Sequence, residues 1–159
     1  MSEPGEEDDA RQRALDLAYR YLGRRDRTVL EVRRHLAGKG VDEGAADEAV
    51  AALLEQGYLD DARYAERFAE DRRTLDAWGR ERIEQRLAAV GVGREAIAAA
   101  LDRPAGDELE AAVALLRRRF AGPPADDRER ERALGLLVRR GYELELAYDA
   151  VRALERDAA

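Results

Sequence analysis

The sequence of 159 residues contains no cysteine, one histidine (His35) and one serine (Ser2). Without cysteine the chain has neither a disulfide framework nor a thiolate zinc site, and a lone imidazole has no second one with which to hold a metal. No apolar run approaches the roughly 18 residues of a membrane span, and no basic start leads into an apolar stretch like that of a signal peptide. We therefore expect a cytoplasmic protein that uses no metal, no cofactor and no membrane.

Motifs for common enzyme chemistry are missing as well. The sequence has no phosphate-cradling glycine loop, no nucleophile motif and no cluster of metal ligands. Its carboxylates alternate with arginines, which is typical of solvated helix faces. The sequence thus predicts a protein that is not an enzyme and that acts by binding.

Basic charge comes almost entirely from arginine, because Lys39 is the only lysine. The chain has 35 acidic and 28 basic residues, a net charge of -7. Five of the acids lie in residues 3–9 without a base, and setting them aside leaves 30 acids against 28 bases. The net charge of -7 argues against a simple DNA-coating protein, although the chain without these five acids is nearly neutral. Arginine suits bidentate pairing with carboxylate or phosphate. Genome composition is the other explanation for the excess of arginine over lysine.

Apolar residues at helical spacing are abundant. Leu15, Ala18, Tyr19 and Leu22 fall at i, i+3, i+4 and i+7, and comparable stripes recur along the chain, whereas no segment alternates as a strand does. The predicted fold class is all-α.

Capping residues predict where several of these helices begin. Thr28 with Glu31, and Asp107 with Glu110, match the capping-box pattern. Single carboxylates at Asp42 and at Asp60 or Asp61 are further N-cap candidates, and Gly57 is placed as a left-handed C-terminal residue. The helix after Asp61 is expected to continue past Phe68 and Leu75 to Trp78, whose aromatic ring is expected in the core rather than as a stacking platform for bases.

An internal repeat is the strongest signal in the sequence. A leucine stands four residues before a glycine in three places, with a period of 51 and then 50 residues: Leu36 and Gly40, Leu87 and Gly91, Leu137 and Gly141. Apolar residues follow at matching offsets each time: Ala46, Ile97 and Ala147, then Val50, Leu101 and Val151. Each copy predicts a helix closed by a left-handed glycine, followed by a short helix with two inward side chains. We expect a disordered acidic tail at 1–10 and three-helix repeats at 11–58, 59–104 and 105–159.

Three stretches of this sequence resemble the RecX family of bacterial RecA regulators. They are LEQGYLDDARYA at 54–65, GRERIEQRLAAVGV at 79–92 and VRRGYELELAYDAVRAL from Val138, and the likeness runs from about Arg11 to Glu155. The order and spacing of these stretches, together with the three repeats, make the resemblance specific.

The resemblance implies a fold and a function. The fold is three tandem three-helix repeats forming an elongated, curved array, since stacked repeats contact mainly their neighbours. The function is to bind the RecA filament on DNA, with roles in DNA repair, recombination and the SOS response, and to inhibit RecA ATPase, filament extension and strand exchange. The implied partner is the RecA nucleoprotein filament, with DNA contacted directly only weakly, and we expect a monomer.

Paired arginines are the candidate filament- or DNA-binding residues, because they recur in the second helix of each repeat. They are Arg33, Arg34, Arg82, Arg86, Arg139 and Arg140. One continuous positive stripe is one interpretation, and an ordinary solvated face with interspersed acids is the other.

The sequence is consistent with two rival functions. Paired helices with glycine turns also occur in helix-turn-helix domains, so a sequence-neutral DNA-binding protein is the alternative. A passive helical scaffold for another partner is the third hypothesis.

Overall fold

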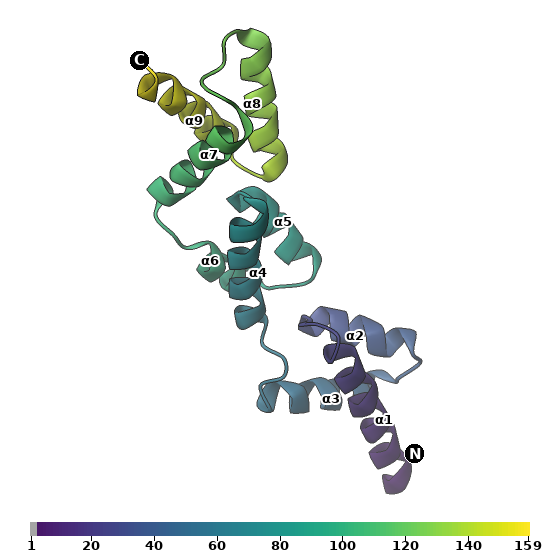
Figure 1. The fold of residues 1–159 in the computed structure, drawn as a ribbon. Coiled ribbons are helices and arrows are strands. Elements are labelled where there is room, and N and C mark those ends of the chain that lie inside the picture. The colour runs from purple at the N-terminus through teal and green to yellow at the C-terminus, as the bar shows by residue number, and fades with distance from the viewer. Residues whose placement is uncertain (1–2) are drawn as a thin grey trace. The chain divides into compact units, whose positions relative to one another are not determined.

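The computed structural model describes residues 3–159, which contain nine helices and no strand (Figure 1). The helices are α1 (Pro4–Leu22), α2 (Val29–Gly38), α3 (Glu43–Glu55), α4 (Asp61–Asp76), α5 (Arg80–Ala89), α6 (Arg94–Leu101), α7 (Ala105–Arg119), α8 (Asp127–Arg140) and α9 (Leu144–Asp157). The all-α prediction is confirmed over this range. No helix in it is both long enough and apolar enough to cross a membrane.

The first helix begins within the segment that we expected to be a disordered tail. Residues 4–10 form the first turns of α1, while residues 1 and 2 of that expected tail lie outside the described range. Pro4 suits a first turn because its missing N–H would have no helical partner there. Glu6 and Glu7 place negative charge at the positive end of the helix dipole. The acidic composition of this segment therefore favours a helix start.

Most of the predicted caps are present. Thr28 and Glu31 form both bonds of a capping box at the start of α2. Asp42 accepts a hydrogen bond from the Ala45 N–H at 3.1 Å. At the helix ends, the predicted left-handed glycines are confirmed, with positive φ at Gly40, Gly57, Gly91 and Gly141.

Helix α4 ends earlier than the sequence predicted. We expected it to reach Trp78, but it stops at Asp76 because Ala77 adopts a φ of 52°. Left-handed backbone at a residue with a Cβ is unfavourable and is held only by surrounding contacts. Trp78 therefore lies after the helix and is half-buried.

Helix α7 begins earlier than the predicted capping box. Asp107 was expected to cap it, but the helix starts at Ala105, directly after Pro104. Asp107 thus lies inside the first turn, where its negative charge interacts favourably with the positive end of the helix dipole.

The chain divides into two compact units, and the first comprises residues up to 65 together with 87–97. Its core lies among α1, α2 and α3. The most buried side chains there are Ala14, Ala18, Val32, Leu36, Ala49, Val50, Leu53 and Leu59.

The second unit comprises residues 66–86 and 98–159. Its core lies among α7, α8 and α9 and includes Ala112, Leu116, Ala133, Leu137, Tyr142, Ala147, Ala150 and Val151. The repeat positions Leu36 and Leu137, and likewise Val50 and Val151, are buried in equivalent places. The boundary between the units crosses α4, α5 and α6, so the middle repeat contributes part of each helix to each unit.

Candidate functional site

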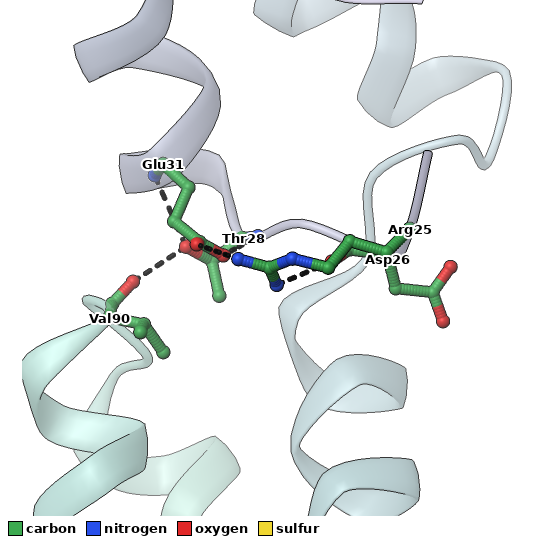
Figure 2. Close-up of polar contacts among 5 residues, drawn as sticks. All are labelled: Arg25, Asp26, Thr28, Glu31 and Val90. Carbon is green, nitrogen blue, oxygen red and sulfur yellow. Dashed lines mark hydrogen bonds and ion pairs between the residues drawn. The ribbon is translucent and has the colours of Figure 1, made fainter. Parts of the chain in front are cut away.

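Residues far apart in the sequence meet at the start of α2 in the first unit (Figure 2). Thr28 is completely buried there. Its Oγ1 accepts from the Glu31 N–H at 3.2 Å and donates to the Val90 carbonyl at 2.6 Å. The Thr28 N–H donates to Glu31 Oε1 at 3.1 Å, and Arg25 Nη2 lies 3.1 Å from Glu31 Oε2. One hydroxyl thus caps α2 and also binds the turn that follows α5.

Glycine allows the close approach at this contact. Gly91, next to Val90, has a φ of 87°, and an added Cβ would lie 2.5 Å from the Cβ of Leu30. A side chain at Gly91 would clash with Leu30 and strain the backbone as well. Asp61 also joins this cluster, because its carboxylate accepts from the Val29 N–H at 3.0 Å. Burial raises the pKa of the Asp61 carboxyl, and the hydrogen bond opposes that rise.

A contact of the same design lies in the second unit, at the start of α5. The Gly79 N–H donates to the Arg140 carbonyl at 2.7 Å. A Cβ on Gly141 would lie 2.3 Å from the Cβ of Arg82, and a Cβ on Gly79 would lie 2.6 Å from the carbonyl carbon of Gly141. In both contacts the acceptor is the carbonyl that precedes the glycine of the repeat. We call these two contacts the repeat joints.

In the first repeat, the equivalent carbonyl accepts a hydrogen bond from a residue of the same repeat. Lys39 precedes Gly40, and its carbonyl accepts from Arg13 Nη2 of α1 at 3.1 Å. A Cβ on Gly40 would meet no atom within 4 Å. The glycine of the first repeat is therefore not packed against a preceding helix start.

Two of the predicted binding arginines, Arg82 and Arg140, are part of the second joint. Arg82 Nη1 donates to the Arg139 carbonyl at 3.1 Å, and its guanidinium lies 4.1 Å from the centroid of the Trp78 ring. Cation–π contact of this kind stabilises the position of the guanidinium. By contrast, the side chains of Arg86 and Arg139 are exposed to solvent.

Arg140 and Tyr142 hold the left-handed residue after α4. Arg140 Nη1 donates to the Asp76 carbonyl, and Tyr142 Oη donates to the Ala77 carbonyl at 3.0 Å. Burial, with a smaller contribution from the Glu108 carboxylate, raises the pKa of Tyr142 to about 12. The phenol is therefore protonated at neutral pH and able to donate this bond.

Arg33 and Arg34, the remaining predicted pair, lie in the first unit, and only one of them is bonded within the protein. Arg33 forms an ion pair with Asp47 of α3. Arg34, the next residue, points its side chain into solvent. Three of the six predicted arginines are thus engaged within the protein, whereas Arg34, Arg86 and Arg139 are accessible.

A basic groove of about 260 Å³ lies between α1 and α2, at residues that the sequence pattern did not indicate as a site. Its lining residues, none of which is acidic, are Leu17, Arg20, Tyr21, Arg24, His35 and Lys39. Tyr21 stacks on His35 with ring centroids 4.0 Å apart, and Arg27 lies 4.0 Å from the centroid of the Tyr21 ring. Burial and the nearby cations lower the pKa of His35, so this imidazole is largely neutral at pH 7. We call this surface the α1–α2 groove.

A larger groove of about 610 Å³ lies between α7 and α8. It is lined by Arg119, Phe120, Arg128, Glu131, Arg132, Leu136 and Arg139, and we call it the α7–α8 groove. Arg139 is the predicted site residue that the structure places here. The other arginines were missed, although the spacing of Arg128, Arg132 and Arg139 along one helix face was a usable signal.

Both grooves offer guanidinium groups, which bind carboxylates and phosphates through paired N–H donors. Across residues 3–159, no group of three or more metal-ligating side chains is placed to hold a metal ion. The chemistry that these surfaces support is electrostatic binding of an anionic partner.

The three helical repeats match three family models in chain order. These models describe the first three-helix domain of RecX at residues 14–61, the second at 60–101 and the third at 106–151. Together the matches extend over most of the chain.

Curated proteins named regulatory protein RecX are similar along much of their length. The one from Stenotrophomonas maltophilia strain R551-3 is 41% identical over 133 residues, which cover 83% of this chain and 78% of the relative. The one from Halorhodospira halophila is 38% identical over 158 residues, which cover 99% of this chain and 96% of the relative.

Two solved structures share the fold. The crystal structure of RecX from Lactobacillus salivarius superposes with a TM-score of 0.82 and 20% identity, covering 93% of this chain and 98% of the other. A second structure, of a regulatory protein RecX, gives a TM-score of 0.77 and 22% identity over 93% of this chain and 74% of the other. At such identities the likeness concerns the fold alone.

Proposed function

This chain belongs to the RecX family, and we propose that it binds the RecA filament on DNA and restrains RecA ATPase activity, filament extension and strand exchange. The observation that supports this most strongly is the succession of three RecX domains along residues 14–151. We further propose that the chain works in the cytoplasm as a monomer, without a cofactor and without chemistry of its own.

The exposed arginines are the better candidates for contact with the filament. Arg33, Arg82 and Arg140 already form bonds within the protein. Binding a partner through them would first cost those bonds, whereas Arg34, Arg86 and Arg139 have exposed side chains. We propose that these three contact the filament and that the other three hold the repeats in shape.

A titration of RecA ATPase activity on single-stranded DNA tests the function. We expect the hydrolysis rate to fall and reach a plateau as the purified full-length chain is added. An unchanged rate at a molar excess of the chain over RecA would contradict the proposal and would favour the passive scaffold.

Variants test the surface separately from the function. The triple change Arg34→Ala, Arg86→Ala and Arg139→Ala is expected to raise the concentration needed for half-inhibition by about three- to tenfold, the range for several exposed charges lost from an interface. A matched control is Arg11→Ala, Arg94→Ala and Arg156→Ala, which removes the same charge from exposed positions elsewhere. Equal effects of the two triples would show that the three arginines are not the contact.

Direct binding to DNA is the second candidate function, and the α1–α2 groove favours it. Its lining includes Arg20, Arg24 and Lys39 and no acid. A protein that neutralises Z phosphates loses affinity with a log-log salt slope near roughly -0.9Z. We expect weak binding to naked DNA and much tighter binding to RecA filaments. Equal affinities with a steep salt slope would favour the DNA-binding function instead.

A further inference from the structure

The arginines of α7 and α8 fall into two groups according to the face on which they lie. On the face toward α9, Arg117 pairs with Asp157 at 2.5 Å and Arg130 pairs with Glu155 at 3.0 Å. On the face of the α7–α8 groove, four arginines are exposed: Arg119, Arg128, Arg132 and Arg139. Within the described residues, no ion pair involves any of these four.

Helix α9 shows what kind of segment the α7–α8 pair can bind. It packs on both helices through an apolar stripe that includes Ala147, Val151 and Leu154, all buried. Its carboxylates Glu155 and Asp157 then pair with arginines at the edge of that contact. An acidic amphipathic segment is thus held by apolar packing with flanking guanidinium–carboxylate bonds.

The α7–α8 groove presents the same two elements without an occupant from this chain. Phe120 and Leu136 are half-buried and supply apolar surface among the arginines. Arg128 and Arg139 are eleven residues apart on α8, which corresponds to about 16 Å along the helix. This length matches about three turns of a bound helix.

We infer that the α7–α8 groove binds an acidic segment of a protein partner, one that places an apolar side chain against Phe120 and Leu136 and carboxylates against the four arginines. The inference rests on the proposed function in taking docking to a protein as the activity of this chain. It adds the chemistry of the partner and a set of contact residues, Arg119, Arg128 and Arg132, beyond those predicted from the sequence.

A protein segment fits this groove better than a nucleic-acid strand does. Phe120 offers a single aromatic face for base stacking, whereas Leu136 offers none and can contact an apolar side chain. Glu131 also lines the groove, and its charge disfavours a continuous run of phosphates. A segment with spaced carboxylates can avoid Glu131 while reaching the arginines.

Fluorescence anisotropy with a synthetic peptide tests the inference on the full-length chain. The probe is a labelled peptide of the same length as α9, 14 residues, in which leucines at helical spacing are flanked by glutamates. Two control peptides replace every glutamate by glutamine or every leucine by serine. A labelled oligothymidylate of similar length represents nucleic acid.

The protein variants pair a groove change with a matched charge change elsewhere. Arg128→Glu with Arg132→Glu reverses two charges in the groove, and Arg11→Glu with Arg94→Glu reverses two exposed charges outside it. Arg128→Gln with Arg132→Gln provides a milder groove change. Thermal unfolding followed by circular dichroism verifies that each variant is folded.

We expect saturable binding of the glutamate–leucine peptide that weakens at least about tenfold in the groove variant and less than about twofold in the control. Both control peptides are expected to bind more weakly. Equal binding of the glutamine peptide, or equal loss in both variants, would overturn the inference. Tighter binding of the oligothymidylate, lost in the groove variant, would overturn it in favour of a nucleic-acid site.

Inhibition of RecA ATPase activity distinguishes this inference from the proposed function. Inhibition of RecA without binding of the peptide would support the proposed function and contradict the inference. Binding of the peptide in the groove without any effect on RecA would support the inference and contradict the proposed function.

Discussion

Gly79 and Arg140 are joined backbone to backbone, with the Gly79 N–H donating to the Arg140 carbonyl at 2.7 Å. The two chain segments approach so closely that a Cβ on Gly79 would lie 2.6 Å from backbone atoms of Gly141. This joint therefore depends on the absence of side chains, and substitution of its glycines gives a direct measure of its packing.

Gly141→Ala is expected to lower the free energy of unfolding by about 2–4 kcal/mol. About 1–2 kcal/mol comes from left-handed backbone and the rest from the clash with Arg82. Gly40→Ala is the matched control, because Gly40 is also left-handed but faces open space, so only the backbone cost of about 1–2 kcal/mol is expected. Urea unfolding followed by circular dichroism measures both. Equal losses would show that the second joint is not tightly packed.

Thr28→Val is expected to destabilise the first unit by about 2–4 kcal/mol. The change removes the cap of α2 and leaves the Val90 carbonyl without its donor. Thr28→Ser keeps the hydroxyl and is expected to lose about 1 kcal/mol, the cost of one buried methyl group. Thermal unfolding compares the two variants. A serine variant as unstable as the valine variant would mean that the hydroxyl contributes little.

Tyr142 is expected to make the protein less stable at high pH. Its pKa is about 12 in the folded protein and about 10 when unfolded, so the unfolded chain loses the phenolic proton first. The free energy of unfolding should therefore fall between about pH 10 and 12, by up to about 1.4 kcal/mol per pH unit.

The matched variant for this pH dependence is Tyr142→Phe. It removes the bond to the Ala77 carbonyl, at a cost of about 1–2 kcal/mol near neutral pH, together with the ionisation itself. Urea midpoints at several alkaline pH values measure the difference. Parallel pH dependence of variant and parent would contradict the assignment.

The extended array predicted from the repeats is tested by small-angle X-ray scattering. A compact globule of this length has a radius of gyration near ~15 Å. We expect a measurably larger value in dilute solution, independent of protein concentration. A value at the globular expectation would contradict the elongated array.

Much of the local structure could be predicted because its causes are local. A glycine after a helical stripe indicates a left-handed ending, as at Gly91 and Gly141. Thr28 with Glu31 three residues later indicates a cap. These signals need only neighbouring residues, and the structure confirms them.

Features that depend on distant residues could not be predicted. Ala77 keeps its unfavourable φ because Tyr142, far along the chain, bonds to its carbonyl. Arg33 looked equivalent to Arg34 in the sequence, but Asp47 pairs with the first and the second is exposed. The groove residues Arg119 and Arg128 come from different helices, so the surface that they share exists only after α7 and α8 have both packed on α9.

The bond between Arg13 and the Lys39 carbonyl limits how the protein can be extended by design. In both joints that carbonyl position is where the preceding repeat attaches, and at the N-terminal repeat Arg13 already occupies it. A fourth unit fused ahead of α1 would have to compete with Arg13 for this carbonyl. Engineering a longer relative of this protein would therefore begin with replacing Arg13 by a residue too short to reach the turn.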